Sequence, residues 1–281
     1  MNQTNKIKIY VAYHKNFPRP QHEYFVPIHV GKKNSEADLG ILGDDTGENI
    51  SEKNPIYCEQ TAYYWAWKND KSFEYIGLSH YRRFFKFDGG KQSVYEITPT
   101  QIQMVTRNIE KLPTLLKQYD VILPRKRVLF SSVKKDFRDC HIPEDWDIMM
   151  QILKELHPSY FAHVREVFEL SNQYNCYNMM ITRRDIFEQY MNWLFPMLEE
   201  FEKRAYISQY PNQRRVIGYL SERLTHLFMY VNRFKKLELP VYFVVESDTL
   251  PEVPLKKLFL RKLQLFYFRY IWKHLVKFNP S

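Results

Sequence analysis

The chain has 281 residues, 44% of them hydrophobic and 26% charged, and its formal net charge is +9 at pH 7. This is the composition of a globular protein, and the length suits one large α/β domain or two small ones. Only eight glycines are present, and no GxGxxG or GxxxxGK[ST] pattern occurs, which argues against a glycine-rich dinucleotide site or a P-loop.

The three cysteines, Cys58, Cys140 and Cys176, show no CxxC spacing. Their odd number and irregular placement argue against a disulfide framework or a zinc site and favour a reducing compartment. The first residues contain no apolar run of signal-peptide length, and no stretch is long enough to cross a membrane as a helix. We therefore expect a cytoplasmic protein.

The predicted elements alternate between strands and helices. Alternating β-branched residues predict a first strand over residues 7–13, and residues 41–54 have the composition of turns. Pro55, with Asn54 as its cap, begins a helix that is apolar nearly all round and runs to Asn69. The later elements are strands at 75–78, 119–124, 176–182 and 240–246, and helices at 100–117, 144–156, 159–170, 183–204 (broken near Pro196) and 216–234, with a loop at 125–143.

This alternation predicts an α/β fold with a mostly parallel central sheet flanked by helices. We expect a single Rossmann-like domain over residues 1–250, followed by a C-terminal amphipathic helix within residues 251–281. Ligands of such sheets bind at the carboxyl ends of the strands.

One strand end carries an unusual set of side chains. In YIGLSHYRRFF, residues 75–85, an apolar strand runs into His80, Tyr81, Arg82 and Arg83. Arginine is costly to bury unless an anion meets it, so the two arginines either pair with carboxylates of the protein or clamp an anionic ligand. Guanidinium groups match phosphate oxygens, and tyrosine and histidine add further donors.

A second segment, GDDTGENIS, places Asp44, Asp45 and Asn49 ahead of the first helix. These side chains either cap backbone amides in a solvated turn or hold a metal ion or the hydroxyls of a ribose. The turn is the more common outcome for such a pattern.

A third segment, DCHIPEDWD, gathers Asp139, Glu144, Asp145 and Asp147 near the start of a helix. Asp145 and Asp147 spell Asp-x-Asp, but residues two apart on a helix do not face the same way, which argues against a metal pair. Acidic residues at a helix start also serve as caps. A single carboxylate of this segment remains a candidate general base.

Three more candidate residues lie in two further segments. Asn178 lies in the predicted strand CYNMMIT and needs partners, either backbone groups or ligand hydroxyls. Glu222 and Arg223 lie in YLSERL on a predicted helix, where adjacent opposite charges usually form a solvated face but can also enter a site.

Positive charge is concentrated at the C-terminal end, where residues 253–281 contain seven Lys/Arg and no acidic residue. Within residues 255–278 the basic residues are mixed with Leu, Phe, Tyr and Trp. This pattern favours a helix that lies on an anionic membrane surface. A nucleic-acid contact and a packed C-terminal helix are the alternatives.

The segments LGDDTGENISEKNPIYCEQTAYYWAWKN, YIGLSHYRRFF, YDVILP, YNMMITRRDIFEQYMNWLFPMLEE and GYLSERL together resemble a family of bacterial capsular and exopolysaccharide biosynthesis proteins. That family shares a domain of unknown function and is regarded as glycosyltransferases. The resemblance runs from about Ile7 to about Phe234, and the HYRR and YWAWKN motifs carry most of it. It implies transfer of a sugar from a nucleotide sugar to a lipid-linked glycan at the inner face of the cell membrane.

The layout also resembles that of metal-dependent glycosyltransferases of the GT-A type, which place an Asp-x-Asp motif at the end of a core strand to hold a metal on the diphosphate. Here the corresponding strand ends in His80, Tyr81, Arg82 and Arg83. By this analogy, cationic and hydroxyl donors replace the metal, while Mn²⁺ or Mg²⁺ remains an alternative. The donor is expected to be a UDP-sugar, with galactose in pyranose or furanose form.

The resemblance implies a displacement at the anomeric carbon in which a carboxylate accepts the proton of the acceptor hydroxyl. Asp145 is our first candidate for this base, followed by Asp139 and Glu144. Asn178 would contact the sugar, and Glu222 and Arg223 would close the far side. A non-catalytic scaffold that binds a phosphorylated glycan lipid is the alternative function, and a nucleic-acid binder is a further one.

Overall fold

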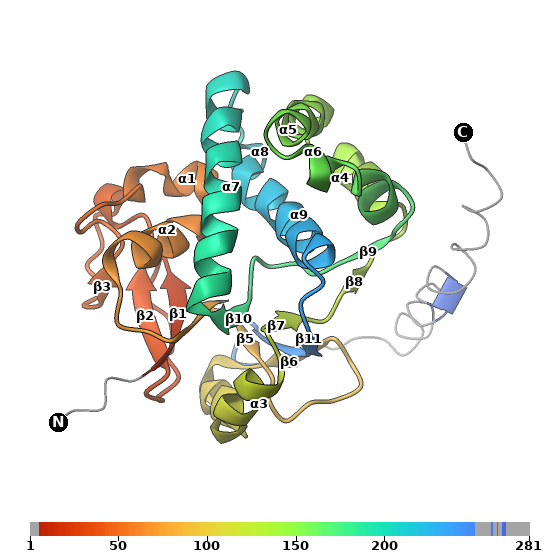
Figure 1. Ribbon diagram of the computed structural model, residues 1–281. Helices are drawn as coiled ribbons and strands as arrows, with labels where there is room; N and C mark the ends of the chain where they lie inside the picture. Colours follow the sequence, from red (N-terminus) through yellow and green to blue (C-terminus); the bar gives the residue numbers. More distant parts are fainter. Residues whose placement is uncertain (1–5, 251–259, 261–262, 264–265, 268–281) are drawn as a thin grey trace.

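The computed structural model describes residues 6–250 together with Leu260, Leu263, Phe266 and Tyr267. Within these residues the chain forms an α/β fold: a mostly parallel central sheet lies between two sets of helices (Figure 1), as the alternation of strands and helices predicts. The predicted tail over residues 251–281 falls outside the described residues, apart from the four named.

The main path of the sheet has the order β11-β7-β10-β4-β1-β2-β3. All neighbours on this path are parallel except β10, which is antiparallel to β4 and to β7. The carboxyl ends of the six other strands therefore share one edge of the sheet. The bounds are β1 (Ile7–Tyr13), β2 (Phe25–His29), β3 (Leu42–Gly43), β4 (Tyr75–His80), β7 (Val121–Pro124), β10 (Ile181–Arg183) and β11 (Lys236–Leu239).

Three further strands extend the sheet beyond the end of β4. β5 (Arg83–Phe85) folds back on β4, with His80 opposite Arg83. β12 (Val241–Val244) pairs with β5 and with β6 (Val94–Ile97). A separate two-stranded ladder joins β8 (Arg127–Val128) to β9 (Gln173–Tyr174).

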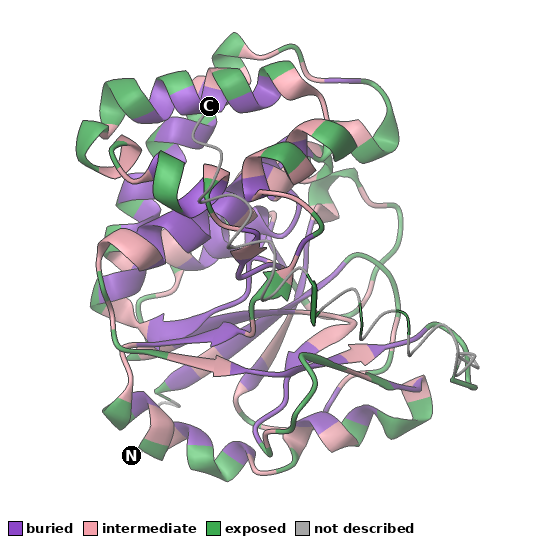
Figure 2. Cartoon of the chain, turned by 90° about the vertical axis from the view of Figure 1, so that its right-hand side faces the viewer, coloured by how far each residue is buried: buried purple, intermediate pink, exposed green. Residues whose placement is uncertain are grey.

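Each face of the sheet has its own apolar core, as the alternation along β1 requires. Tyr10 and Ala12 point into one core, and Ile9, Val11 and Tyr13 point into the other. Figure 2 shows the buried residues between the sheet and the helices on either side. Most of the longer helices cover the first face, and α3 with two 3₁₀ segments covers the second.

The helices on the first face surround the aromatic side chains of α2 and α7, such as Tyr63, Phe187 and Tyr190. Their bounds are α1 (Asn54–Tyr57), α2 (Gln60–Asn69), α4 (Val133–Cys140), α5 (Pro143–Leu156), α6 (Pro158–Phe161), α7 (Arg184–Arg204), α8 (Pro211–Arg214) and α9 (Val216–Val231). On the second face lie α3 (Leu112–Gln118) and the 3₁₀ segments Pro99–Thr106 and Ile109–Lys111.

Several predicted elements differ in detail. The helix expected to run unbroken from Pro55 is divided at Cys58, whose φ is 53°. The helix expected to break near Pro196 is continuous, because Pro196 lies on the exposed side of α7, where water can bond the freed carbonyl group. The segment 100–117 is mostly 3₁₀ rather than one α-helix.

The loop predicted over residues 125–143 contains β8 and α4. The helix α4 begins after Ser132, whose hydroxyl accepts the amide N–H of Lys135, and buries Val133 and Phe137. This cap and the spacing of the two apolar residues were the signals available in the sequence. The strand predicted over residues 176–182 is reduced to Ile181–Arg183.

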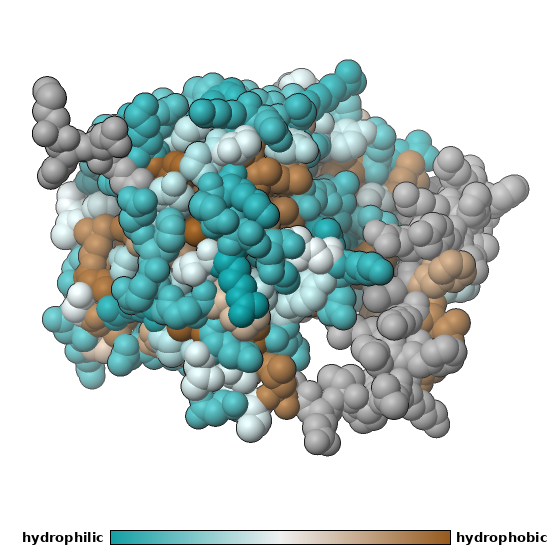
Figure 3. Space-filling model, turned by 90° about the horizontal axis from the view of Figure 1, so that it is seen from below, coloured by the Kyte–Doolittle hydropathy of each residue, from teal (hydrophilic) through white to brown (hydrophobic). Residues whose placement is uncertain are grey.

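The surface seen from below in Figure 3 is mainly hydrophilic in its described part, with apolar residues in small groups between the polar ones. This is the usual pattern of a solvent-exposed face. No helix in the described part of the chain combines the length and the apolar composition needed to cross a bilayer.

Candidate functional site

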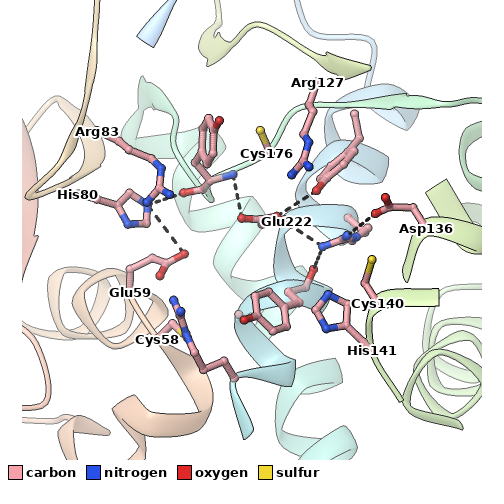
Figure 4. Close-up of a pocket in the computed structure, with 16 residues that line it drawn as sticks. Cys58, Glu59, His80, Arg83, Arg127, Asp136, Cys140, His141, Cys176 and Glu222 are labelled. Atoms are coloured by element: carbon pink, nitrogen blue, oxygen red, sulfur yellow. Dashed lines mark hydrogen bonds and ion pairs between the residues drawn. The ribbon is translucent and has the colours of Figure 1, made fainter. Parts of the chain in front are cut away.

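A cavity of about 320 Å³ lies at the edge where the parallel strands end. The end of β4, the start of β5, β8, the segment after β9, α4 and α9 all contribute side chains to it. Figure 4 shows Glu222 near its middle, with Glu59 and His80 on one side and Asp136 and His141 on the other. The cavity thus combines acidic, basic and cationic groups at the place where α/β proteins bind ligands.

The tight turn between β4 and β5 divides the HYRR motif. His80 and Arg83 stand opposite each other across the turn and both line the cavity. Tyr81 packs edge-on against Phe17, and Arg82 pairs with Glu246 over 3.0 Å. Arg82 therefore has a carboxylate partner outside the cavity lining, whereas Arg83 lines the cavity.

Three guanidinium groups at the cavity, those of Arg83, Arg127 and Arg215, have no carboxylate at ion-pair distance among the described residues. Arg83 lies over the ring of Tyr177, 4.8 Å from its centroid. Arg215 donates from Nε to the sulfur of Cys58 over 3.3 Å. Burial raises the pKa of the Cys58 thiol to about 12, so this partner is neutral at pH 7. The four arginines that line the cavity outnumber its three carboxylates, so its formal charge is positive.

Arg223 differs from these three because it is buried and paired. Its guanidinium donates to Asp136 over 3.3 Å and to the carbonyl oxygen of Tyr219 over 3.0 Å, and it lies 3.5 Å from Glu222. The ring of Tyr174 lies against it, with its centroid at 4.7 Å. Such a buried, multiply bonded arginine holds its neighbours in place rather than awaiting a ligand.

Glu222 is the carboxylate held most firmly at the cavity. It accepts the amide N–H of Tyr177 over 2.9 Å and the hydroxyl of Tyr174 over 3.3 Å. Burial raises the pKa of its carboxyl above the usual range, and the neighbouring Arg223 opposes this rise. A carboxylate with a raised pKa in a cavity is suited to accept a proton from a bound hydroxyl.

Glu59 and His80 form a second group. The side-chain amide of Asn178 donates to Oε1 of Glu59 over 2.6 Å. Nε2 of His80 donates to the carbonyl oxygen of Tyr177 over 2.5 Å and lies 3.9 Å from Glu59. Burial lowers the pKa of His80 despite the nearby carboxylate, so its imidazole is neutral at pH 7.

The backbone around this cavity is strained. Five non-glycine residues of the described chain have positive φ, and three of them, Cys58, Tyr177 and Asn178, line the cavity or bond to its lining. A non-glycine residue in this region costs about 1–3 kcal/mol and persists only where its surroundings hold it. Strain of this kind concentrates at functional sites.

The structure brings four of the predicted site residues together: His80, Arg83, Glu222 and Arg223 line the cavity. Asn178 lies directly behind them and bonds two lining residues, Glu59 and Gly218. It belongs to an irregular segment with a φ of 50° and not to the strand expected there.

Asp44, Asp45 and Asn49 do not reach the cavity lining. Asp44 is fully buried and accepts the amide N–H groups of Gly31 and Lys32. Asn49 donates to the backbone carbonyl of Asp45 over 3.1 Å. These contacts are those of a capped turn.

Asp139, Glu144 and Asp145 also lie outside the lining. Asp139 is exposed at the end of α4 and pairs with Lys135 over 2.9 Å. Glu144 and Asp145 occupy the first turn of α5, and burial raises the pKa of Asp145 to about 6. The carboxylates that do line the cavity are Glu59, Asp136 and Glu222.

Glu59, Arg127 and Arg215 were not among the predicted residues. Glu59 follows the helix break at Cys58, and Arg127 lies in a segment with the composition of a loop. Arg215 immediately precedes α9, and an arginine at a helix start carries no signal of its own. Within the described residues, no group of three or more His, Cys, Asp or Glu side chains converges as a metal site would require.

Comparisons with known proteins extend these observations. The model of one protein family, described as a domain of unknown function (DUF4422), matches residues 8–233. Among solved structures, the apo structure of the bifunctional glycosyltransferase WbbM matches with a TM-score of 0.78 and 32% sequence identity. The match covers 89% of this chain and 48% of that one, so the chain spans about half of its length. No curated protein matches the sequence.

Proposed function

The chain belongs to the DUF4422 family, and from this premise we propose that it is a glycosyltransferase that uses a nucleotide sugar as donor. The similarity to WbbM supports transfer of a glycosyl group in general terms. The observation that carries the proposal is the set of three guanidinium groups, those of Arg83, Arg127 and Arg215, that face one cavity without carboxylate partners in the described chain.

These groups suit the diphosphate of a nucleotide sugar. Guanidinium groups bind phosphate oxygens through two parallel hydrogen bonds and keep their charge at all physiological pH values. As the glycosidic bond to the phosphate breaks, negative charge grows on the departing diphosphate, and fixed cations stabilise it. Since no three His, Cys, Asp or Glu side chains converge in the described part of the chain, we assign no step to Mn²⁺ or Mg²⁺.

Glu222 takes the place of Asp145 as the proposed base, because Glu222 lines the cavity and Asp145 does not. The acceptor hydroxyl oxygen attacks the anomeric carbon, and its proton passes to the Glu222 carboxylate. The bond between the anomeric carbon and the phosphate oxygen breaks, and its electron pair leaves with the diphosphate. This displacement inverts the anomeric configuration.

The proposed donor and acceptor come from the resemblance of the sequence to capsular and exopolysaccharide biosynthesis proteins. We propose a UDP-sugar, with galactose or galactofuranose as the transferred group, and a lipid-linked glycan as acceptor in the synthesis of capsule, exopolysaccharide or O-antigen. The basic residues within 255–278 would bring the enzyme to the anionic inner face of the cell membrane. A GT-A-like arrangement agrees with the parallel strands around the antiparallel β10.

Calorimetry with UDP, GDP, CMP and their sugars, each in EDTA and in Mn²⁺, tests the proposal. Arg83→Ala should weaken binding about 10- to 100-fold, the loss expected for one charge-assisted contact. Arg82→Ala is the matched control, because Arg82 pairs with Glu246 outside the cavity lining and its loss should leave affinity unchanged.

Binding in EDTA that depends on Arg83 would support a metal-free clamp and identify the nucleotide. Binding only with Mn²⁺ would contradict the metal-free clamp. If none of the nucleotides binds under either condition, the transferase proposal fails, and the alternative of a non-catalytic scaffold for a phosphorylated glycan lipid gains support. The same cations would then bind the lipid phosphate.

A further inference from the structure

Two consecutive residues between β9 and β10 link the acidic groups of the cavity. The amide N–H of Tyr177 donates to Glu222 over 2.9 Å, and the carbonyl oxygen of Tyr177 accepts from His80 over 2.5 Å. The backbone of one residue thus holds a side chain from α9 on one side and a side chain from the end of β4 on the other.

Asn178 completes this link. Its Nδ2 donates to Oε1 of Glu59 over 2.6 Å and to the carbonyl oxygen of Gly218 over 3.0 Å. Gly218 lies about one turn before Glu222 on α9, so this amide ties the helix of one carboxylate to the side chain of the other. Asn178 is 2% exposed, so water cannot replace these bonds.

Both residues have a positive φ, a backbone conformation that residues other than glycine seldom adopt. Tyr177 has a φ of 77° and Asn178 a φ of 50°. Asparagine visits this region more readily than most residues, whereas a tyrosine there is uncommon. The bonds to Glu222, His80, Glu59 and Gly218 are what hold the turn. A strained turn persists only where its surroundings hold it, and here these are side chains and backbone of the cavity.

We propose that the Tyr177–Asn178 turn is the positioning element of the site. It fixes Glu222, the proposed base, relative to Glu59 and His80. Its Asn178 amide, which bonds Glu59 and Gly218 and none of the arginines, therefore governs turnover rather than donor affinity. This inference rests on the proposed glycosyltransferase function. A turn with a purely structural role would affect stability without a selective loss of turnover.

Asn178→Gly separates these roles, because glycine adopts a φ of 50° without strain but has no side-chain amide. The assay is release of UDP from UDP-galactose with water as acceptor. We expect kcat to fall at least 10-fold while KM stays within twofold. The melting temperature should fall no further than that of the Asn175 control described below, since each variant loses buried hydrogen bonds. Asn178→Asp, which replaces the donor to Glu59 by a carboxylate, gives the same test if the glycine variant does not fold.

Asn175→Ala is the matched control. Asn175 is a buried asparagine of the same segment, but it bonds the carbonyl oxygen of Pro124 and the ring of His226 instead of a carboxylate of the cavity. Its loss should lower the melting temperature and leave kcat unchanged. An Asn178 variant with unchanged kcat, or one whose kcat falls no more than that of Asn175→Ala, would overturn the inference.

A second readout does not depend on activity. In protein with ¹⁵N-labelled histidine, the ring signals of His80 report the proton on Nε2 and its bond to Tyr177. We expect Asn178→Gly to shift these signals, because Glu59 loses its fixed place beside the ring. Unchanged His80 signals would contradict the positioning role even if the enzyme releases no UDP. Absence of UDP release by the wild type would instead count against UDP-galactose as donor.

Discussion

Arg215 donates a hydrogen bond to the thiol of Cys58 over 3.3 Å and meets no carboxylate within ion-pair distance in the described chain. Since burial keeps this thiol neutral, the bond orients the guanidinium without cancelling its charge. A cation oriented in this way is ready to bind an anion without rearrangement.

Arg215→Ala should therefore weaken the binding of UDP about 10- to 100-fold without lowering stability, because a ligand contact is lost and no buried carboxylate is left unpaired. Calorimetry and thermal unfolding measure the two effects. Arg214→Ala is the control, since Arg214 is exposed and outside the cavity lining. Equal affinities of the Arg215 and Arg214 variants would refute the role of Arg215.

Gly218→Ala should destabilise the protein, although alanine usually stabilises a helix by about 1 kcal/mol relative to glycine. A Cβ at this position would lie 2.8 Å from the sulfur of Cys58 and 3.1 Å from its Cβ. Thermal unfolding should show a lower melting temperature for the single variant. Adding Cys58→Gly should restore it, because glycine removes the obstructing side chain and tolerates the φ of 53°.

Asp145→Asn should stabilise the protein at neutral pH and not at pH 4. Burial raises the folded-state pKa of Asp145 to about 6, above its unfolded value near 3.9. The contribution of Asp145 to stability is therefore complete below about pH 3.9 and is lost as the pH rises through 6. We expect a gain of about 1–2 kcal/mol at pH 7.5, since the start of α5 offsets part of the charge penalty.

Denaturant unfolding at the two pH values measures this difference. The same variant should bind UDP with wild-type affinity, because Asp145 does not line the cavity. A gain in stability that is equal at both pH values would contradict the assignment of a buried carboxyl that titrates near pH 6.

Cys140 should be the cysteine that reacts first with a maleimide, and bound UDP should slow its reaction. Cys140 is exposed and lines the cavity, whereas Cys58 and Cys176 are buried. Mass spectrometry of digested protein identifies the labelled site, and Cys140→Ser should remove the fast reaction. A rate that is indifferent to saturating UDP would place the nucleotide elsewhere on the protein.

The sequence was sufficient to predict the fold class, because the alternation of strands and helices extends over most of the chain. It was less informative where elements are short. The three residues of β10 do not indicate whether the strand runs parallel or antiparallel to its neighbours. Its antiparallel pairing depends on the path of the segment that precedes it. The segment Cys176–Met180 has a strand-like composition, yet its contacts hold Tyr177 and Asn178 in a turn.

The sequence allowed us to predict site residues that lie at the end of a clear strand or within a long helix. His80, Arg83 and Glu222 are examples, and the structure brings them to one cavity. Arg127 and Arg215 could not be predicted in this way, because their convergence depends on how β8 and α9 pack, which no local pattern encodes. Asp145 was chosen for its acidic neighbours, but its position on α5 turns it away from the cavity lining.

The two-residue turn between β4 and β5 has a consequence for comparing related sequences. Since it sends Arg82 and Arg83 to different surroundings, the two letters of the Arg-Arg pair are under different constraints. The first should be exchangeable wherever the residue at position 246 changes with it, while the second should tolerate no such exchange. An alignment gap placed in this turn would therefore assign the proposed ligand contact to the wrong arginine.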